Sequence, residues 1–134
     1  MSGLVLKLGP KERVLINGAV IENGDRRSRL SIVTPDAKIL RLRDAIHPEE
    51  ATTPVRRLLF SVQLVLSGDK EPQAAQTSLL RQMEELSQVF TDSDSRQILA
   101  EASAALVSLQ HYRVLKALRC LLPREDRLLS VRPS

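Results

Sequence analysis

The chain has 134 residues, of which 43% are hydrophobic and 27% charged, with a formal net charge of +4 and three aromatic residues. This length fits one domain or two small packed subdomains, and the composition excludes a disordered tail, a collagen-like repeat and a disulfide scaffold. The single cysteine cannot form an internal disulfide, and no apolar run reaches the roughly 20 residues that span a bilayer. We therefore expect a cytoplasmic protein with no signal peptide and no membrane association.

The charge is unevenly distributed along the chain. Residues 1–66 carry 11 Lys/Arg and 7 Asp/Glu, residues 67–101 carry 3 and 7, and residues 102–134 carry 6 and 2. Basic residues gathered on one subdomain are typical of polyanion-binding proteins, although a solvated surface is the simpler explanation of a net +4 alone. With three aromatic residues, any nucleic-acid contact is expected to depend on arginines and backbone groups.

The first 46 residues have the pattern of five short strands. Asn17-Gly18 separates two apolar runs, and an Asn-Gly pair in that position is the strongest short signal of a β-hairpin. Gly9-Pro10, Asn23-Gly24 and Thr34-Pro35 mark further turns. The strands are expected at residues 4–8, 13–16, 19–22, 30–33 and 38–43.

The last of these strands carries two arginines. In a strand, Leu40 and Leu42 share one face, while Ile39, Arg41 and Arg43 share the other. Because a strand fixes the spacing between residues i and i+2, Arg41 and Arg43 form a more specific candidate phosphate site than a loop cluster does. The alternative is a solvated sheet face. Replacing both arginines with alanine is expected to leave the fold intact.

The apolar residues at 55–66 fit both a strand and a helix. The ends of this segment favour a helix, because Thr53 is a good N-cap, Pro54 suits the first helical position and Gly68 suits the position just past the end.

Two longer helical patterns follow, at residues 73–90 and 95–122. The second is long for one globular helix and is expected to divide into two. Asp94 resembles the first residue of a capping box, and Pro123 is expected to end the last helix. Cys120 lies in an apolar stretch and is interpreted as a small core residue.

These elements predict an α+β fold with two parts. A small antiparallel β subdomain over residues 1–46 is followed by a linker at 47–52. A helical subdomain of three to four helices is expected over 53–129, and a tail over 130–134.

Groups for catalysis or metal binding are missing from the sequence. His47 and His111 are the only histidines and fall in different subdomains, and no HExxH, CxxC, GxGxxG or P-loop pattern occurs. We therefore predict that the protein is not an enzyme and uses no metal or other cofactor.

Arg26, Arg27 and Arg29 follow a turn and lead into a strand. Guanidinium groups pair bidentately with phosphate oxygens, so this run is a candidate phosphate site. A solubilising loop that guards an edge strand explains it equally well.

Arg56 and Arg57 lie in the first turn of the expected helix, where the helix dipole disfavours cations. An external anionic partner, a carboxylate such as Glu49 or Glu50, or simple exposure would each resolve this local conflict.

Three strings of the chain are distinctive: VLINGAVIENGDRR at 14–27, ATTPVRRLLF at 51–60, and YRVLKALR at 112–119 together with RED at 124–126. In this order they resemble the FlbT family of flagellin-mRNA repressors. The resemblance implies a post-transcriptional repressor in flagellum biogenesis. Such a protein associates with the 5′ untranslated region of flagellin mRNA, represses its translation and promotes its degradation.

Residues 1–46 also remotely resemble CsrA, a small dimeric translational regulator. In that fold the first strand and the arginine-bearing last strand of partner chains form the RNA-binding edge. By this resemblance, Leu4, Leu6, Arg41 and Arg43 would contact RNA. The complete set of candidate RNA-binding residues is Leu4, Leu6, Arg26, Arg27, Arg29, Arg41, Arg43, Arg56 and Arg57.

A second functional class stays open. In this alternative, the helical subdomain is an adaptor that binds a flagellar protein or regulator and acts on mRNA indirectly. Direct RNA binding weakens as salt rises, whereas binding of a helix in a groove depends on salt weakly. A homodimer is also compatible with the sequence.

Overall fold

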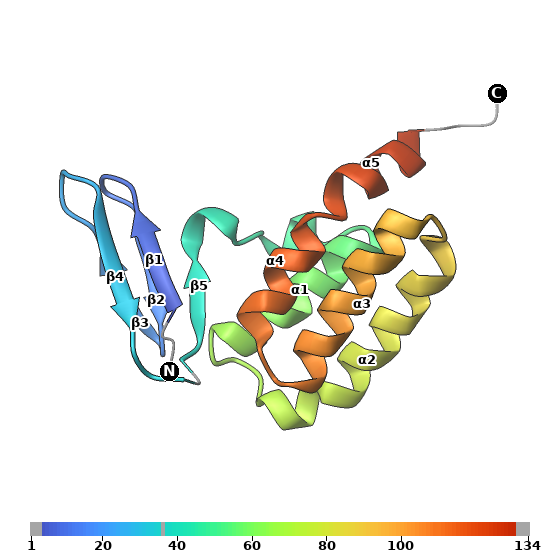
Figure 1. Cartoon of the computed structure of the whole chain (residues 1–134), viewed down its shortest axis with the longest axis horizontal. Helices are drawn as coiled ribbons and strands as arrows, with labels where there is room; N and C mark the ends of the chain where they lie inside the picture. Colours follow the sequence, from blue (N-terminus) through green and yellow to red (C-terminus); the bar gives the residue numbers. More distant parts are fainter. Residues whose placement is uncertain (1–3, 36, 131–134) are drawn as a thin grey trace.

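The computed structural model describes residues 4–35 and 37–130 and has the α+β fold expected from the sequence (Figure 1). A β-rich part is followed by a helical bundle. The strands are β1 (Leu4–Leu8), β2 (Arg13–Ile16), β3 (Ala19–Glu22), β4 (Ser28–Ile32) and β5 (Ile39–Arg41). The helices are α1 (Pro54–Leu66), α2 (Pro72–Val89), α3 (Ser93–Val107), α4 (His111–Arg119) and α5 (Leu122–Ser130), with short 3₁₀ turns at Leu42–Asp44 and Pro48–Glu50.

The strands form two antiparallel sheets. β1 pairs with β4 in a two-stranded ribbon, and β3, β2 and β5 form a three-stranded sheet in that order. The β2–β3 hairpin turns at Asn17 and Gly18, whose φ angles of 49° and 87° are the positive values that a type I′ turn needs. The Asn-Gly signal therefore predicted this hairpin correctly.

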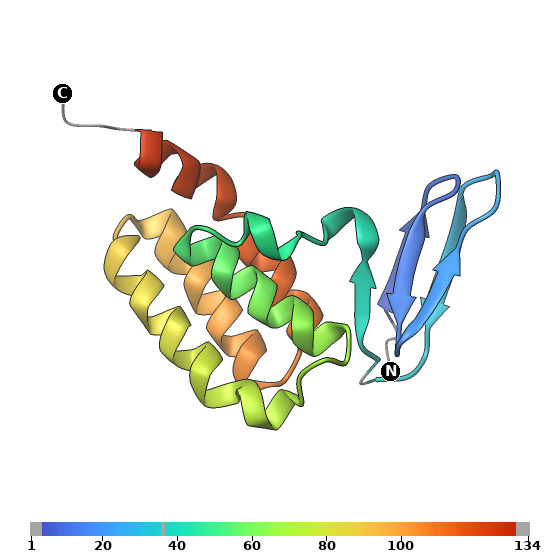
Figure 2. The same cartoon turned by 180° about the vertical axis from the view of Figure 1, so that it is seen from behind.

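β5, an edge strand of the three-stranded sheet, lies between the ribbon and the helices (Figures 1 and 2). Val14 and Ile39 face the ribbon and pack against Leu6 and Leu8. Leu40, next along β5, faces the other way and belongs to the core of the helical bundle. The alternation of side chains along β5 thus joins the two hydrophobic clusters through one strand.

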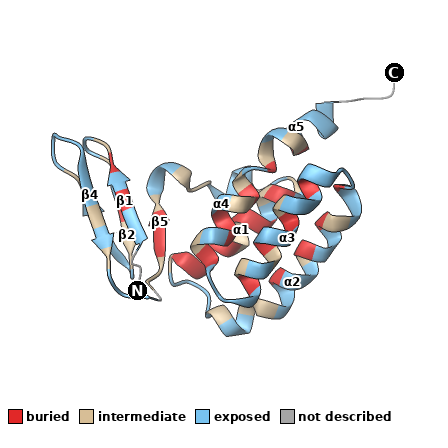
Figure 3. Ribbon diagram, viewed as in Figure 1, coloured by how far each residue is buried: buried red, intermediate tan, exposed pale blue. Residues whose placement is uncertain are grey.

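The bundle core is built from apolar residues of the segments expected to be helical. Figure 3 shows the buried residues concentrated on the inner faces of α1, α3 and α4. Thr53 caps α1 by accepting a hydrogen bond from the backbone N–H of Arg56, and Gly68 has a φ of 89° just beyond its end. The helical interpretation of residues 55–66 is therefore confirmed.

Two expectations about the bundle are confirmed in outline and corrected in detail. The pattern at 95–122 divides into α3 and α4, with Leu109 at a φ of 58° between them. Asp92, not Asp94, caps α3 through Ser95. Pro123 does not end a helix but stands in the first turn of α5, where its missing N–H costs no hydrogen bond.

Two further expectations are wrong. The last strand ends at Arg41, and the chain turns into a 3₁₀ helix over Leu42–Asp44, so Leu42 is exposed instead of sharing a face with Leu40. Cys120 is exposed, because α4 buries Val114, Leu115 and Leu118 and the cysteine falls on the opposite side just past its end.

The division of the chain into a β subdomain (1–46) and a helical subdomain (53–129) remains a proposal. The two hydrophobic clusters support it, but Leu40 crosses into the helical cluster and Tyr112 packs against both clusters. Within the expected tail, Ser130 is the last residue of α5, and residues 131–134 lie outside the described part of the chain.

Candidate nucleic-acid interface

The arginine run at 26–29 lies on the ribbon. Arg26 and Arg27 stand in the loop before β4, Arg29 is the second residue of that strand, and all three are exposed. None of them has an acidic partner within 4 Å among the residues that the structure describes. These three cations are therefore available to an external anion.

Asn23 holds this arginine loop in place. Its side-chain amide donates hydrogen bonds to the carbonyl oxygens of Gly9 at 2.6 Å and Arg26 at 2.9 Å. Its side-chain oxygen accepts one from the Ser28 hydroxyl at 2.7 Å. The sequence indicated only a turn at Asn23, and its bridging role depends on the approach of Gly9, 14 residues earlier in the chain.

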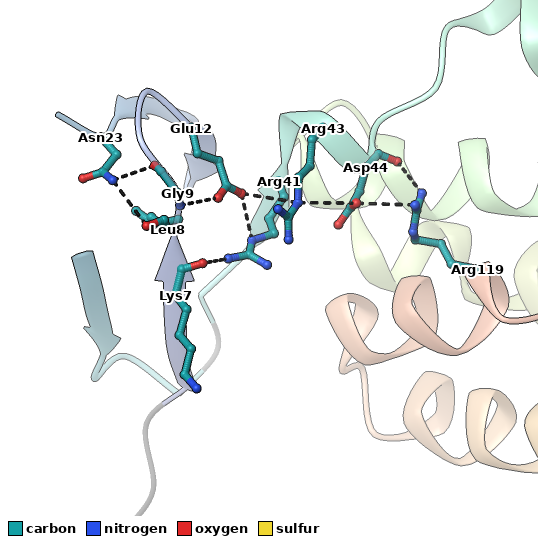
Figure 4. A network of polar contacts seen from close by, with 9 residues as sticks. All are labelled: Lys7, Leu8, Gly9, Glu12, Asn23, Arg41, Arg43, Asp44 and Arg119. Carbon is teal, nitrogen blue, oxygen red and sulfur yellow. Dashed lines mark hydrogen bonds and ion pairs between the residues drawn. The ribbon is translucent and has the colours of Figure 1, made fainter. Parts of the chain in front are cut away.

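Arg41 belongs to an internal ion-pair network, shown in Figure 4. Its Nε lies 3.1 Å from Glu12 Oε2, and the two side chains are only 13% and 8% exposed. The guanidinium also donates to the carbonyl oxygen of Lys7 on β1, while the other Glu12 oxygen accepts from the Gly9 N–H at 2.9 Å. Arg41 thus connects the central sheet to the ribbon.

This burial corrects one expectation about the two arginines of β5. Arg41→Ala would leave the buried Glu12 carboxylate without its nearest cation, so the fold is not expected to tolerate it unchanged. Arg43 is different, because its side chain is 60% exposed. Its Nε lies 3.5 Å from Glu12 Oε2, which is a longer contact than that of Arg41. Of the pair, Arg43 is the one accessible to an external anion.

The network continues into the bundle through Asp44. Arg119 of α4 lies 3.5 Å from Asp44 Oδ1 and donates a hydrogen bond to the Asp44 carbonyl oxygen at 3.2 Å. Beside it, Tyr112 packs against both hydrophobic clusters, and burial raises the pKa of its hydroxyl. The contact therefore fixes the position of the sheet relative to α4.

The two leucines of the candidate set have different environments. Leu6 is buried in the ribbon–sheet core, whereas Leu4 is partly exposed at the start of β1. Within this chain β1 pairs with β4 and β5 pairs with β2, whereas the edge that the CsrA resemblance implies joins strands of two partner chains. That Leu4 and Leu6 contact RNA stays a prediction.

Arg56 and Arg57 lie far from the ribbon, at the start of α1. Arg56 pairs with Glu125 at 3.3 Å and Asp126 at 3.0 Å, and the hydrogen bond that its guanidinium donates to Asp126 raises the pKa of that guanidinium. The acids that form ion pairs with Arg56 therefore come from α5, about 70 residues later, and Glu50 adds only a weaker electrostatic contribution to the raised pKa. Arg57 is exposed and donates to the Thr52 carbonyl oxygen.

The structure thus separates the candidate residues into three places. The ribbon carries Arg26, Arg27 and Arg29, the sheet–bundle junction carries Arg41 and Arg43, and the end of the bundle carries the pair on α1. Across residues 4–35 and 37–130, no group of three or more potential ligands is placed to hold a metal ion. No helix in the same ranges is long and apolar enough to cross a membrane.

Comparison with known proteins identifies the family. The family model described as flagellar protein FlbT matches residues 4–129. A protein of Caulobacter sp. (strain K31) named "Probable flagellum biosynthesis repressor protein FlbT" is 32% identical over 94% of this chain and 95% of its own length. A protein of Rhodopseudomonas palustris (strain TIE-1) with the same name is 35% identical over 95% and 98%.

A third relative, from Caulobacter vibrioides (strain ATCC 19089 / CIP 103742 / CB 15), is named "Flagellum biosynthesis repressor protein FlbT" and is 29% identical over 92% of this chain. These names describe a regulator and not an enzyme, in agreement with the missing catalytic pattern. No solved structure matches the chain. Because the family model and the relatives cover nearly the whole chain, the protein belongs to the FlbT family of flagellar proteins.

Proposed function

We propose that this protein is a cytoplasmic repressor of flagellum biosynthesis that binds the 5′ untranslated region of flagellin mRNA directly. The occupied leader excludes the ribosome, and the untranslated message is then degraded. The names of the relatives support the repressor role. The RNA target follows from the sequence resemblance to flagellin-mRNA repressors.

One observation carries the direct mechanism. Arg26, Arg27 and Arg29 are exposed and lack acidic partners in the described ranges, although their loop is held by the Asn23 hydrogen bonds. A loop that is already held by hydrogen bonds loses little conformational entropy when it binds a ligand. Its cations are therefore suited to the phosphates of single-stranded RNA or of an RNA hairpin loop. By contrast, Arg41 and Arg56 are already paired within the protein.

The test is a mobility-shift titration of a flagellin leader transcript with the purified protein. The logarithm of the binding constant should fall with the logarithm of salt concentration, with a slope of about −0.7 for each phosphate contact. The triple variant R26Q/R27Q/R29Q should lose most of this slope. Arg81→Gln, which removes an exposed cation from α2, is the control and should bind like the wild type.

The adaptor alternative has its own structural feature. A groove of about 390 Å³ lies between α2 and α3, with Met83 and Leu99 at its base and Leu80 and Ala100 among its walls. Ala100→Arg fills this groove from an exposed helical position. If the variant binds leader RNA normally but loses repression in cells, the adaptor function is favoured.

Absence of any shift with wild-type protein at low salt would contradict direct RNA binding. Sedimentation of the same preparation distinguishes the monomer from the homodimer, which also remains a proposal.

A further inference from the structure

The outer face of the β1–β4 ribbon places two cations directly opposite each other. In the antiparallel register, Lys7 of β1 is the partner of Arg29 of β4. Leu6 and Leu8 point to the core, so the alternation of side chains places Lys7 and Arg29 on the solvent face, and both are exposed. Figure 4 shows the Lys7 side chain pointing away from the Arg41–Glu12 network.

Like charges directly opposite on an antiparallel pair destabilise it, because the two Cβ atoms lie only about 4.5–5.5 Å apart. Their neighbours on this face, Val5 and Ser31, carry no charge. Neither cation has an acidic partner within 4 Å in the part of the chain that is described. Among the described residues, no ion pair therefore offsets the repulsion.

The neighbouring three-stranded sheet has a cross-strand pair of opposite charges at the equivalent kind of position. There Arg13 of β2 is the register partner of Glu22 of β3, and the two side chains form an ion pair of 2.8 Å. The guanidinium of Arg13 also lowers the pKa of the Glu22 carboxyl. One cross-strand pair is thus neutralised within the chain, whereas the other presents two positive charges to the outside.

We propose that Lys7 and Arg29 form a cross-strand clamp for the phosphodiester backbone of RNA, with Lys7 as a binding residue additional to the arginine run. This inference rests on the direct RNA binding proposed above. The two side chains project from different strands of one rigid ribbon, so they can neutralise neighbouring phosphates of one strand. Phosphate contacts carry no sequence information, so the clamp provides affinity and orientation and not specificity.

The proposal predicts opposite effects on stability and on binding. Lys7→Thr and Arg29→Thr keep a residue that is favourable in strands and remove one of the repelling charges. Each variant should therefore raise the urea midpoint at low ionic strength, and this gain should shrink as salt screens the repulsion. The same variants should weaken RNA binding, which a merely structural pair of residues would not do.

The experiment measures urea unfolding and RNA binding for the wild type, Lys7→Thr, Arg29→Thr and Arg13→Thr. The probes are a flagellin leader transcript and a shuffled transcript of equal length. Each ribbon variant should lower the magnitude of the salt slope by about 0.7 and weaken both RNAs by the same factor. Arg13→Thr removes an equal charge from a neutralised pair, so it should lower the urea midpoint slightly and leave the slope unchanged.

The outcomes separate the clamp from the function on which it rests. If the wild type binds RNA but the slopes of the Lys7 and Arg29 variants are unchanged, the clamp is wrong and direct binding by other residues stands. If the wild type binds neither RNA, both proposals fail. If removal of either charge lowers the urea midpoint, the repulsion argument is overturned, whatever the binding result.

Discussion

Replacement of Glu125 is expected to destabilise the bundle more than any change to a surface charge. Glu125 lies in α5 and its side chain is 5% exposed. One carboxylate oxygen accepts from the Thr53 hydroxyl, and the other accepts from the Val55 backbone N–H at 2.8 Å. Glu125 is the only buried residue of α5, so it fastens this helix to the start of α1.

The magnitude follows from the groups that lose their partner. Glu125→Ala leaves the buried Val55 N–H unsatisfied, which costs about 1–3 kcal/mol, and removes a charge-assisted bond to Thr53 worth a similar amount. Loss of the ion pair between Arg56 and Glu125 costs little, because the Arg56 guanidinium is partly exposed and keeps its ion pair with Asp126 at 3.0 Å. We expect a total loss of about 2–6 kcal/mol in the free energy of unfolding.

Urea denaturation followed by circular dichroism checks this value. With a slope of about 1–3 kcal/mol per molar urea, the midpoint should fall by about 1 M or more. Glu125→Gln keeps an acceptor for Val55 and should fall between the wild type and Glu125→Ala. Asp126→Asn is the matched control, because Asp126 is exposed, and it should change stability by about 0.5 kcal/mol or less.

A second readout reports on α5 itself. Without Glu125, α5 should separate from α1 more often while the rest of the bundle stays folded, so trypsin should cleave at Arg127 faster in native buffer. A Glu125→Ala variant with wild-type stability and wild-type cleavage would refute the view that this carboxylate fastens α5 to α1.

Three further predictions concern other parts of the fold. Glu12→Gln should lower the free energy of unfolding by about 1–3 kcal/mol, since it removes the carboxylate charge beside the largely buried Arg41 side chain. Arg43→Ala should have little effect, and the urea midpoints of the two variants test this difference. Gly18→Ala should cost about 1–2 kcal/mol, because alanine is strained at a φ of 87°, while Gly24→Ala, without a positive φ, should cost less. Burial lowers the pKa of His111 in the folded state, so the unfolded state binds the proton more tightly. The free energy of unfolding should therefore fall as the pH drops below the ordinary pKa of 6.5. The difference in urea midpoint between about pH 7.5 and about pH 5.5 should be smaller in His111→Leu than in the wild type.

Local sequence determined most of the secondary structure. Asn17 and Gly18 specified the hairpin because few residues tolerate two successive positive φ angles. Thr53 and Gly68 marked the ends of α1 because a helix terminus needs a side-chain acceptor or a left-handed residue. Each of these signals acts within a few residues, so it can be found without knowledge of the tertiary structure.

Contacts between distant segments decided whether each candidate arginine has an acidic partner within the protein. Arg41 is neutralised because the β1–β2 turn brings Glu12 to it, and Arg56 because α5 returns to the start of α1. No periodicity in the sequence indicates either partner, since ion pairs across 29 and 69 residues depend on how the elements pack. The cross-strand register of Lys7 and Arg29 has the same origin.

The sequence by itself therefore determined the family, the α+β class and the list of cations available for an anionic partner. Only the tertiary structure separated cations that already have an internal counter-ion from those that face solvent. The physical reason is that local propensity acts through backbone conformation, whereas the neutralisation of a charge depends on which segments meet in space.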